Sequence, residues 1–325
     1  MKFNTPFVWA LAQRAGPQCV TFLFLFGLAK FLGPQEFGLL ALAQIWLGGF
    51  RVVGDAGLSS TVIQAQALSG SQLSSVFFLN LGMFLVLAVL SCTSIWAFPL
   101  ASEMAELPLV VMALSLTLPI SGLSVTQLAL AYRGMRFRFL AFRDLFAALA
   151  GGGAGIAAAI NGWGVWALVL QALVASLVNA MLLWRGSDWS PKISEFSMAG
   201  LRPLLSFSLW ILAFQIFSYA VKEVDKTLIG ILVGISMLGI YALASKAILL
   251  PTVIFSDALN TYLFPKMSSL QASPDGLRKV YASSISLTMC FALPLTFILG
   301  MALHLYGPKL LGAQWSGVEE LAPYI

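Results

Sequence analysis

Long uninterrupted apolar runs recur along this chain, and they constrain its fold more than any other feature. A helix that crosses the hydrocarbon layer of a membrane needs about 20 mainly apolar residues. The runs are continuous rather than alternating, which favours helices over the strands of a membrane barrel. A tenth run begins near Leu321. The nine complete ones are residues 7–31, 38–62, 76–98, 108–131, 139–160, 165–184, 204–232, 237–262 and 281–304.

Composition supports a polytopic, all-α membrane protein. Of the 325 residues 59% are hydrophobic and 10% are charged, whereas soluble domains carry about 25% charged residues. Cys19, Cys92 and Cys290 lie in apolar runs without metal-binding spacing, and His304 is the only histidine. We therefore expect no metal site, no cofactor and no nucleic-acid partner. The net charge of +5 is informative only through the distribution of basic residues between the loops on the two sides of the membrane.

Basic residues indicate the orientation of the chain in the membrane. With the N-terminus placed in the cytoplasm, eleven of the 18 Lys and Arg fall inside and only Lys30 and Lys309 fall outside, which satisfies the positive-inside rule. The remaining five lie within predicted spans: Arg14, Arg51, Lys222, Lys226 and Lys246.

A thirteen-residue pattern occurs twice, 201 residues apart. Residues 32–44 read LGPQEFGLLALAQ, residues 233–245 read VGISMLGIYALAS, and both contain G-x4-G-x2-A-L-A. Each copy lies at the turn between a first and a second predicted span. Because six spans separate them, both units have the same orientation, which is a parallel repeat. We predict two pseudo-symmetric six-helix lobes around a central cavity, an N-terminal lobe at 1–200 and a truncated second lobe at 201–325.

Three segments resemble one family of bacterial membrane proteins. They are LAKFLGPQEFGLLALAQ at 28–44, the segment Val224–Gln271 that begins VDKTLIGILVG, and YGPKLLGAQWSGVEELAPYI at 306–325. All three are similar to the Wzx-type polysaccharide flippases, within the multidrug/oligosaccharidyl-lipid/polysaccharide exporter superfamily. Residues 76–200 match mainly in hydropathy.

The resemblance implies a V-shaped cavity that opens alternately to each side of the bacterial cytoplasmic (inner) membrane. It implies a non-enzymatic transporter of polyprenyl-(pyro)phosphate-linked oligosaccharide for polysaccharide biosynthesis, such as lipopolysaccharide or O-antigen export, with H⁺ or Na⁺ as candidate coupling ions. Members usually have twelve or more spans. This chain departs from that pattern, either as a fragment or as a naturally shortened product.

Charges inside the predicted spans need a physical reason, because a charge at mid-bilayer costs about 2.5–3.5 kcal/mol on insertion scales. Arg51 and Asp55 stand four residues apart on one helix and can pair. Arg14 and Lys246 have no acid within four residues, so each either snorkels to a membrane face, pairs with a distant acid, or serves a cavity.

The resemblance places these cations at basic positions that face the family's cavity. Arg14 opens an R-x-G motif, Arg51 precedes the D-A-G of Asp55, and Lys246 ends a Y-x-L-A-x-K motif. Arg offers a fork to phosphate oxygens and Lys a point charge. We predict that Arg14, Arg51 and Lys246 share one cavity and bind the phosphate of a lipid-linked glycan.

Four further charges lie close together in the seventh predicted span: Lys222, Glu223, Asp225 and Lys226. Their spacing allows two i, i+3 pairs, Lys222 with Asp225 and Glu223 with Lys226. We interpret the set either as permanent ion pairs between spans or as an ion-coupling site at Asp225 or Glu223.

Two other functions remain open from the sequence. A cation-coupled drug exporter of the same superfamily would favour a cavity dominated by acids and aromatics. A membrane-embedded polysaccharide polymerase or glycosyltransferase would need catalytic groups on an outer loop or in a cavity. The isolated basic residues favour the flippase.

Overall fold

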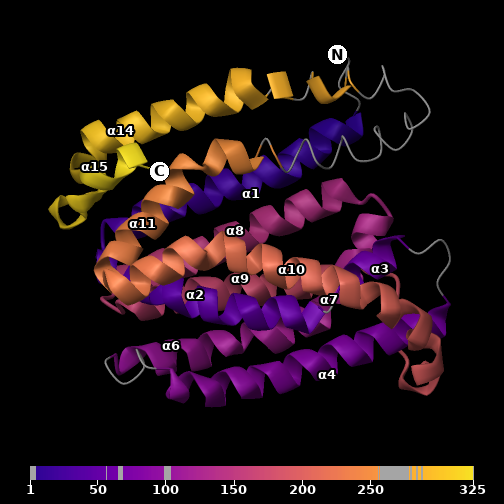
Figure 1. The fold of residues 1–325 in the computed structure, drawn as a ribbon. Helices are drawn as coiled ribbons and strands as arrows, with labels where there is room; N and C mark the ends of the chain where they lie inside the picture. The colour runs from indigo at the N-terminus through magenta and orange to yellow at the C-terminus, as the bar shows by residue number, and fades with distance from the viewer. Residues whose placement is uncertain are drawn as a thin grey trace.

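The computed structural model is a bundle of long helices (Figure 1). It describes residues 5–55, 57–64, 69–98, 104–254, 256, 278, 280–282, 285–286 and 288–324, without the side chains of residues 5–14, 64, 198–209, 313 and 324. Its helices are α1 (Thr5–Ala29), α2 (Pro34–Asp55), α3 (Leu58–Gln64), α4 (Gly70–Ser94), α6 (Glu106–Ser115), α7 (Thr117–Arg133), α8 (Phe137–Ile160), α9 (Val165–Gly186), α10 (Met198–Leu232), α11 (Ile235–Ile248), α14 (Leu293–Leu311) and α15 (Gly317–Leu321).

The helices have the length and surface of membrane spans. In the described part of the chain six segments are long and apolar enough to cross a bilayer, and their outward faces expose large apolar side chains such as Val89 and Phe297. Such faces suit contact with lipid tails, whereas exposing them to water would be unfavourable. The segments are α2, α4 extended to Ala97, α6 joined to α7, α8, α9, and Met289–Leu311. The chain is therefore a multi-pass, all-α membrane protein, as predicted.

Small residues let α8 pack closely on both of its neighbours. A methyl group at Gly151 would lie 2.7 Å from the carbonyl oxygen of Gln171 on α9, and one at Gly152 would overlap the ring of Phe24 on α1. Association of helices in lipid depends on such close backbone approach, because apolar side chains gain little from leaving lipid. The glycine run of α8 thus joins α1 to α9.

Two predicted spans are divided in the structure. The predicted span 38–62 is interrupted after Asp55, and the chain turns at Gly57, whose φ of +72° glycine adopts without strain. The predicted span 108–131 breaks at Leu116, between α6 and α7. Pro119 has no N–H to donate to the carbonyl of Ser115, so this turn cannot be a regular helix. The apolar pattern alone predicts neither break.

The two copies of the repeated motif are in direct contact. A methyl group at Gly38 of α2 would overlap the carbonyl oxygen of Ile235, and one at Gly239 of α11 would overlap the carbonyl oxygen of Pro34. Gly239 and Ile235 are the residues 201 positions after Gly38 and Pro34, so each copy makes the same contact with the other. Both helices therefore begin at the same end of the bundle (Figure 1). A two-fold relation between the repeats predicts this arrangement; the division into lobes at residue 200 stays a prediction.

This reciprocal crossing predicts that neither glycine tolerates a side chain. Gly38→Ala and Gly239→Ala should each destabilise the protein by about 1–3 kcal/mol, because the added methyl group forces the two backbones apart. The measurement is the thermal unfolding midpoint in detergent. Gly153→Ala, where the methyl group meets no atom within 4 Å, is the matched control. Equal midpoints for all three variants would contradict the close crossing.

Candidate substrate cavity

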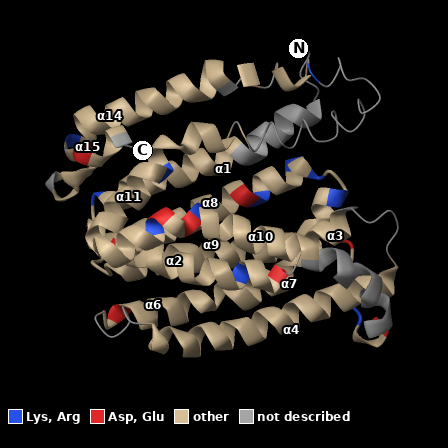
Figure 2. Cartoon of the chain, in the orientation of Figure 1, with Lys and Arg blue, Asp and Glu red and all other residues tan. Residues whose placement is uncertain are grey.

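A cavity of about 510 Å³ lies between α1, α2, α10 and α11, and four of its six acidic and basic side chains are basic. Figure 2 shows charged residues gathered over α10 and α2 near the middle of the bundle, as well as at its ends. We call this space the cation cavity. Its charged lining residues are Arg51, Lys222, Glu223, Asp225, Lys226 and Lys246. With all of them ionised, the four bases and two acids leave a formal charge of +2.

Arg51 lies on α2, and its exposed side chain lines both the cation cavity and a second, adjoining cavity. Its Nη2 donates to Oγ1 of Thr117 at 3.2 Å, at the break between α6 and α7. That hydroxyl in turn donates to the carbonyl of Leu114 at 2.7 Å. This one contact leaves further N–H groups of the guanidinium available to a ligand.

The expected pair between Arg51 and Asp55 does not form among the described side chains. Oδ1 of Asp55 instead accepts the Ser59 backbone N–H at 3.3 Å and also the Ser59 hydroxyl. The reason is the break at Gly57, because α3 begins there with backbone N–H groups that have no partner within the helix. Asp55 therefore caps the first turn of α3, although it stands two residues before Gly57, the usual N-cap position.

Lys246 lies on α11 and lines the same cavity as Arg51. Its side chain is exposed to this space, and within the described part of the chain it makes no hydrogen bond or ion pair. Ser245 beside it is buried and donates to the carbonyl of Tyr241 at 2.6 Å. The structure therefore brings Arg51 and Lys246 to one cavity, while their role in binding stays a prediction.

The third predicted cation, Arg14, belongs to α1, but its side chain lies outside the described residues. Gln18, one turn further along α1, lines the cation cavity. Whether Arg14 joins the site stays a prediction.

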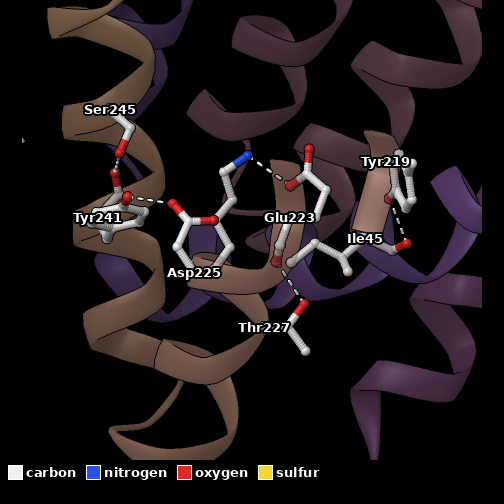
Figure 3. Close-up of polar contacts among 8 residues, drawn as sticks. Ile45, Tyr219, Glu223, Asp225, Thr227, Tyr241 and Ser245 are labelled. Atoms are coloured by element: carbon white, nitrogen blue, oxygen red, sulfur yellow. Dashed lines mark hydrogen bonds and ion pairs between the residues drawn. The ribbon is translucent and has the colours of Figure 1, made fainter. Parts of the chain in front are cut away.

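Of the two ion pairs expected on α10, one forms. Lys226 donates to Glu223 at 2.7 Å, in the part-buried lining of the cavity. Asp225 turns instead toward α11, where the Tyr241 hydroxyl donates to its Oδ2 (Figure 3). Lys222 is exposed to the cavity and has no ion-pair partner among the described residues. The expected Lys222–Asp225 pair was wrong because Asp225 finds its partner on another helix.

Two further features surround these charges, an oxygen atom without a hydrogen-bond donor and a tyrosine that joins two helices. The Oδ1 atom of Asp225 is buried and accepts no hydrogen bond from the described protein. On the other side of Glu223, the Tyr219 hydroxyl donates to the Ile45 carbonyl of α2 at 2.7 Å, which ties α10 to α2 (Figure 3). Sequence reasoning missed both tyrosines, although Tyr241 opens the Y-x-L-A-x-K motif that ends at Lys246.

The capping contact of Asp55 predicts how that position tolerates substitution. Asp55→Ala should lower stability by about 0.5–2 kcal/mol, whereas Asp55→Asn, which keeps an oxygen acceptor, should cost little. Thermal unfolding in detergent compares the two. If Asp55 were instead held by Arg51, losing the charge alone would be costly, so an Asn variant as unstable as the Ala variant would contradict the capping role.

The arrangement of helices is that of a known class of transporter. The structure matches the solved inward-facing conformation of a multidrug resistance MATE family transporter of the MOP superfamily, with a TM-score of 0.66 and 14% sequence identity over 96% of this chain and 79% of that one. The outward-facing form of such a transporter matches with a TM-score of 0.54 and 16% identity, over 98% of this chain and 77% of that one. At such identities the likeness is one of fold.

The sequence carries the relationship further: the chain belongs to the polysaccharide biosynthesis protein family, whose model matches residues 27–320. It is 25% identical to the succinoglycan biosynthesis transport protein ExoT of Rhizobium meliloti, over 95% of this chain and 62% of that protein. It is 22% identical to the lipopolysaccharide biosynthesis protein WzxC of Escherichia coli, over 90% of this chain and 59% of that protein. The resemblance seen in the three sequence segments is thus confirmed. The chain spans less than two thirds of the length of both relatives.

Proposed function

We propose that the protein translocates a lipid-linked oligosaccharide across the cytoplasmic membrane by alternating access, for polysaccharide biosynthesis. The observation that carries this proposal is the net positive cavity between α2, α10 and α11, inside a bundle whose outer faces are apolar. The MATE-like fold and the names of the relatives support it. A third relative is a probable low-salt glycan biosynthesis flippase of Haloferax volcanii, 24% identical over 94% of this chain and 63% of that protein.

The charge of the cavity fits a polyprenyl phosphate or diphosphate. Carrying such an anion through hydrocarbon is unfavourable unless counter-charges accompany it. Arg51 and Lys246 line the same cavity from two helices, so both supply positive charge to one anionic ligand within it. Arg supplies a fork of donors and Lys a compact charge. In this proposal Arg14 adds a third cation from α1.

The orientation of the protein is part of the same proposal. The excess of Lys and Arg in alternate loops favours a cytoplasmic N-terminus in the bacterial inner membrane. The crossing of α2 and α11 then lies toward the outer face. Export of O-antigen in particular is a narrower hypothesis within this function.

A drug exporter is the second candidate, because solved structures of the same fold are multidrug transporters. A cation-coupled drug exporter would favour a cavity dominated by acids and aromatics, whereas the charged groups of this one leave a formal charge of +2. A polymerase or glycosyltransferase is disfavoured by the family membership and by the transport and flippase names of its relatives.

Substitution of the cavity cations tests this function. In cells that depend on the gene, Arg51→Ala and Lys246→Ala should each reduce glycan export about ten- to a hundredfold, because a hydrogen bond to a charged group contributes about 1.5–3 kcal/mol. The measurement is surface polysaccharide together with the lipid-linked precursor that accumulates on the cytoplasmic face. Lys309→Ala, at an exposed lysine outside the cavity, is the control. Export at the level of the control in both variants would contradict the proposed site.

Asp225 provides a test of ion coupling. Its buried Oδ1 without a hydrogen-bond donor is a place where a proton or Na⁺ can bind, and binding there would change the net charge of the cavity. We expect Asp225→Asn to fold but to make flux independent of the imposed H⁺ or Na⁺ gradient. Flux measured in proteoliposomes against each gradient decides this. A variant with normal flux and unchanged gradient dependence would leave Asp225 with a structural role only.

A further inference from the structure

A second cavity, of about 610 Å³, lies inside the first group of helices, between α2, α4, α7, α8 and α9. We call it the lobe cavity. Gln44 and Arg51 line both the lobe cavity and the cation cavity, so the two spaces adjoin along α2. A volume of this size is typical of sites for small organic ligands.

Polar side chains reach the lobe cavity from several spans. Ser176 and Asn179 come from α9, and Ser121 and Ser124 come from α7. The Asn179 Oδ1 atom is buried and accepts no hydrogen bond from the described protein. Leaving a buried acceptor without a partner costs about 1–3 kcal/mol, so a ligand that donates to this oxygen would gain the hydrogen bond that the protein does not supply.

The hydrogen-bonding groups of this cavity include both donors and acceptors. The hydroxyls of Ser121 and Ser124 each donate to a backbone carbonyl one turn earlier, at 2.8 Å, so their lone pairs remain free to accept. Asn179 offers an amide N–H₂ group as well as its oxygen, and Gln44 does the same. A phosphate needs donors only, whereas a sugar hydroxyl both donates and accepts.

The charges also distinguish the lobe cavity from the cation cavity. Arg143 lines it but is buried and paired with Asp144. Arg51 and Asp55 then leave the lining with no net charge. The apolar part of the lining comes from residues such as Leu47, Phe84 and Ile120. A neutral pocket with mixed hydrogen-bonding groups and apolar walls suits a neutral, polyhydroxylated ligand.

We propose that the lobe cavity binds the saccharide part of the substrate while the adjoining cation cavity binds its phosphate. This inference rests on the proposed flippase function and assigns the glycan to a place in it. Arg51 stands between the two, where the sugar meets the phosphate. Asn179 and Ser176 then act as saccharide-binding residues.

Affinities for lipids with and without a sugar test the saccharide site and the phosphate site separately. The probes are undecaprenyl diphosphate and the same lipid carrying a single glucose, galactose or N-acetylglucosamine, with affinity measured for the purified protein in nanodiscs. We expect at least one sugar to raise the affinity about tenfold over the bare lipid. Asn179→Ala and Ser176→Ala should each remove most of that gain and leave the affinity for undecaprenyl diphosphate unchanged.

Lys246→Ala should weaken binding of both lipid forms. Asn161→Ala, at an exposed amide outside both cavities, is the matched control and should change neither. Ser176→Ala removes a single hydroxyl and keeps the test valid if Asn179→Ala unfolds. Sugars that never raise the affinity, or variants that weaken both lipid forms equally, would overturn the saccharide site while the phosphate site stands. A protein that binds none of the lipids would overturn the proposed function as well.

Discussion

The crossing of α2 and α11 is the contact on which the rest of the site depends. At Gly38 and Gly239 the backbone of each helix approaches a carbonyl oxygen of the other so closely that no side chain fits between them. Lipid gives apolar side chains little reason to associate, so helix pairs in a membrane rely on backbone packing of this kind. The crossing fixes the start of both helices, and Arg51 and Lys246 follow further along each one, on the walls of the same cavity.

Apolar surroundings then decide what each charge does. Asp55 caps a helix that begins after a glycine turn, Glu223 holds Lys226, and one oxygen of Asp225 accepts a tyrosine hydroxyl from the next helix. Each of these contacts lowers the cost of a charge inside the bundle. Lys222 and Lys246 have no such partner among the described side chains. Together with Arg51, which donates to the neutral Thr117 hydroxyl, they are the charges for which an anionic ligand would be the missing partner.

Much of the fold was predictable from hydropathy, because a membrane span is a local property of about 20 residues. The repeat likewise indicated that α2 and α11 are equivalent, although it gave no sign that they touch. The breaks after Asp55 and at Leu116 escaped the hydropathy pattern, since a turn of apolar and small residues resembles the span around it, and in the sequence only Gly57 and Pro119 mark them. The partners of Asp225 and Arg51 escaped it too, because Tyr241 and Thr117 come from other helices. Which side chains pair across a bundle depends on how each helix is rotated about its own axis. The spacing of residues along one helix does not give that orientation.

The nature of the crossing also bears on how such a cavity opens to the other side. In alternating access the contact that closes one end must separate in each cycle. The contacts that identify this crossing, Gly38 with Ile235 and Gly239 with Pro34, are backbone van der Waals contacts, so parting them breaks no ion pair and strands no buried charge. Lipid or water can replace such contacts, whereas separating α10 from α11 would break the Tyr241–Asp225 hydrogen bond and leave a part-buried carboxylate without its donor. A glycine crossing at the end of the cavity thus supplies a separable contact for the proposed cycle, and the Tyr241–Asp225 hydrogen bond along the wall supplies a fixed one.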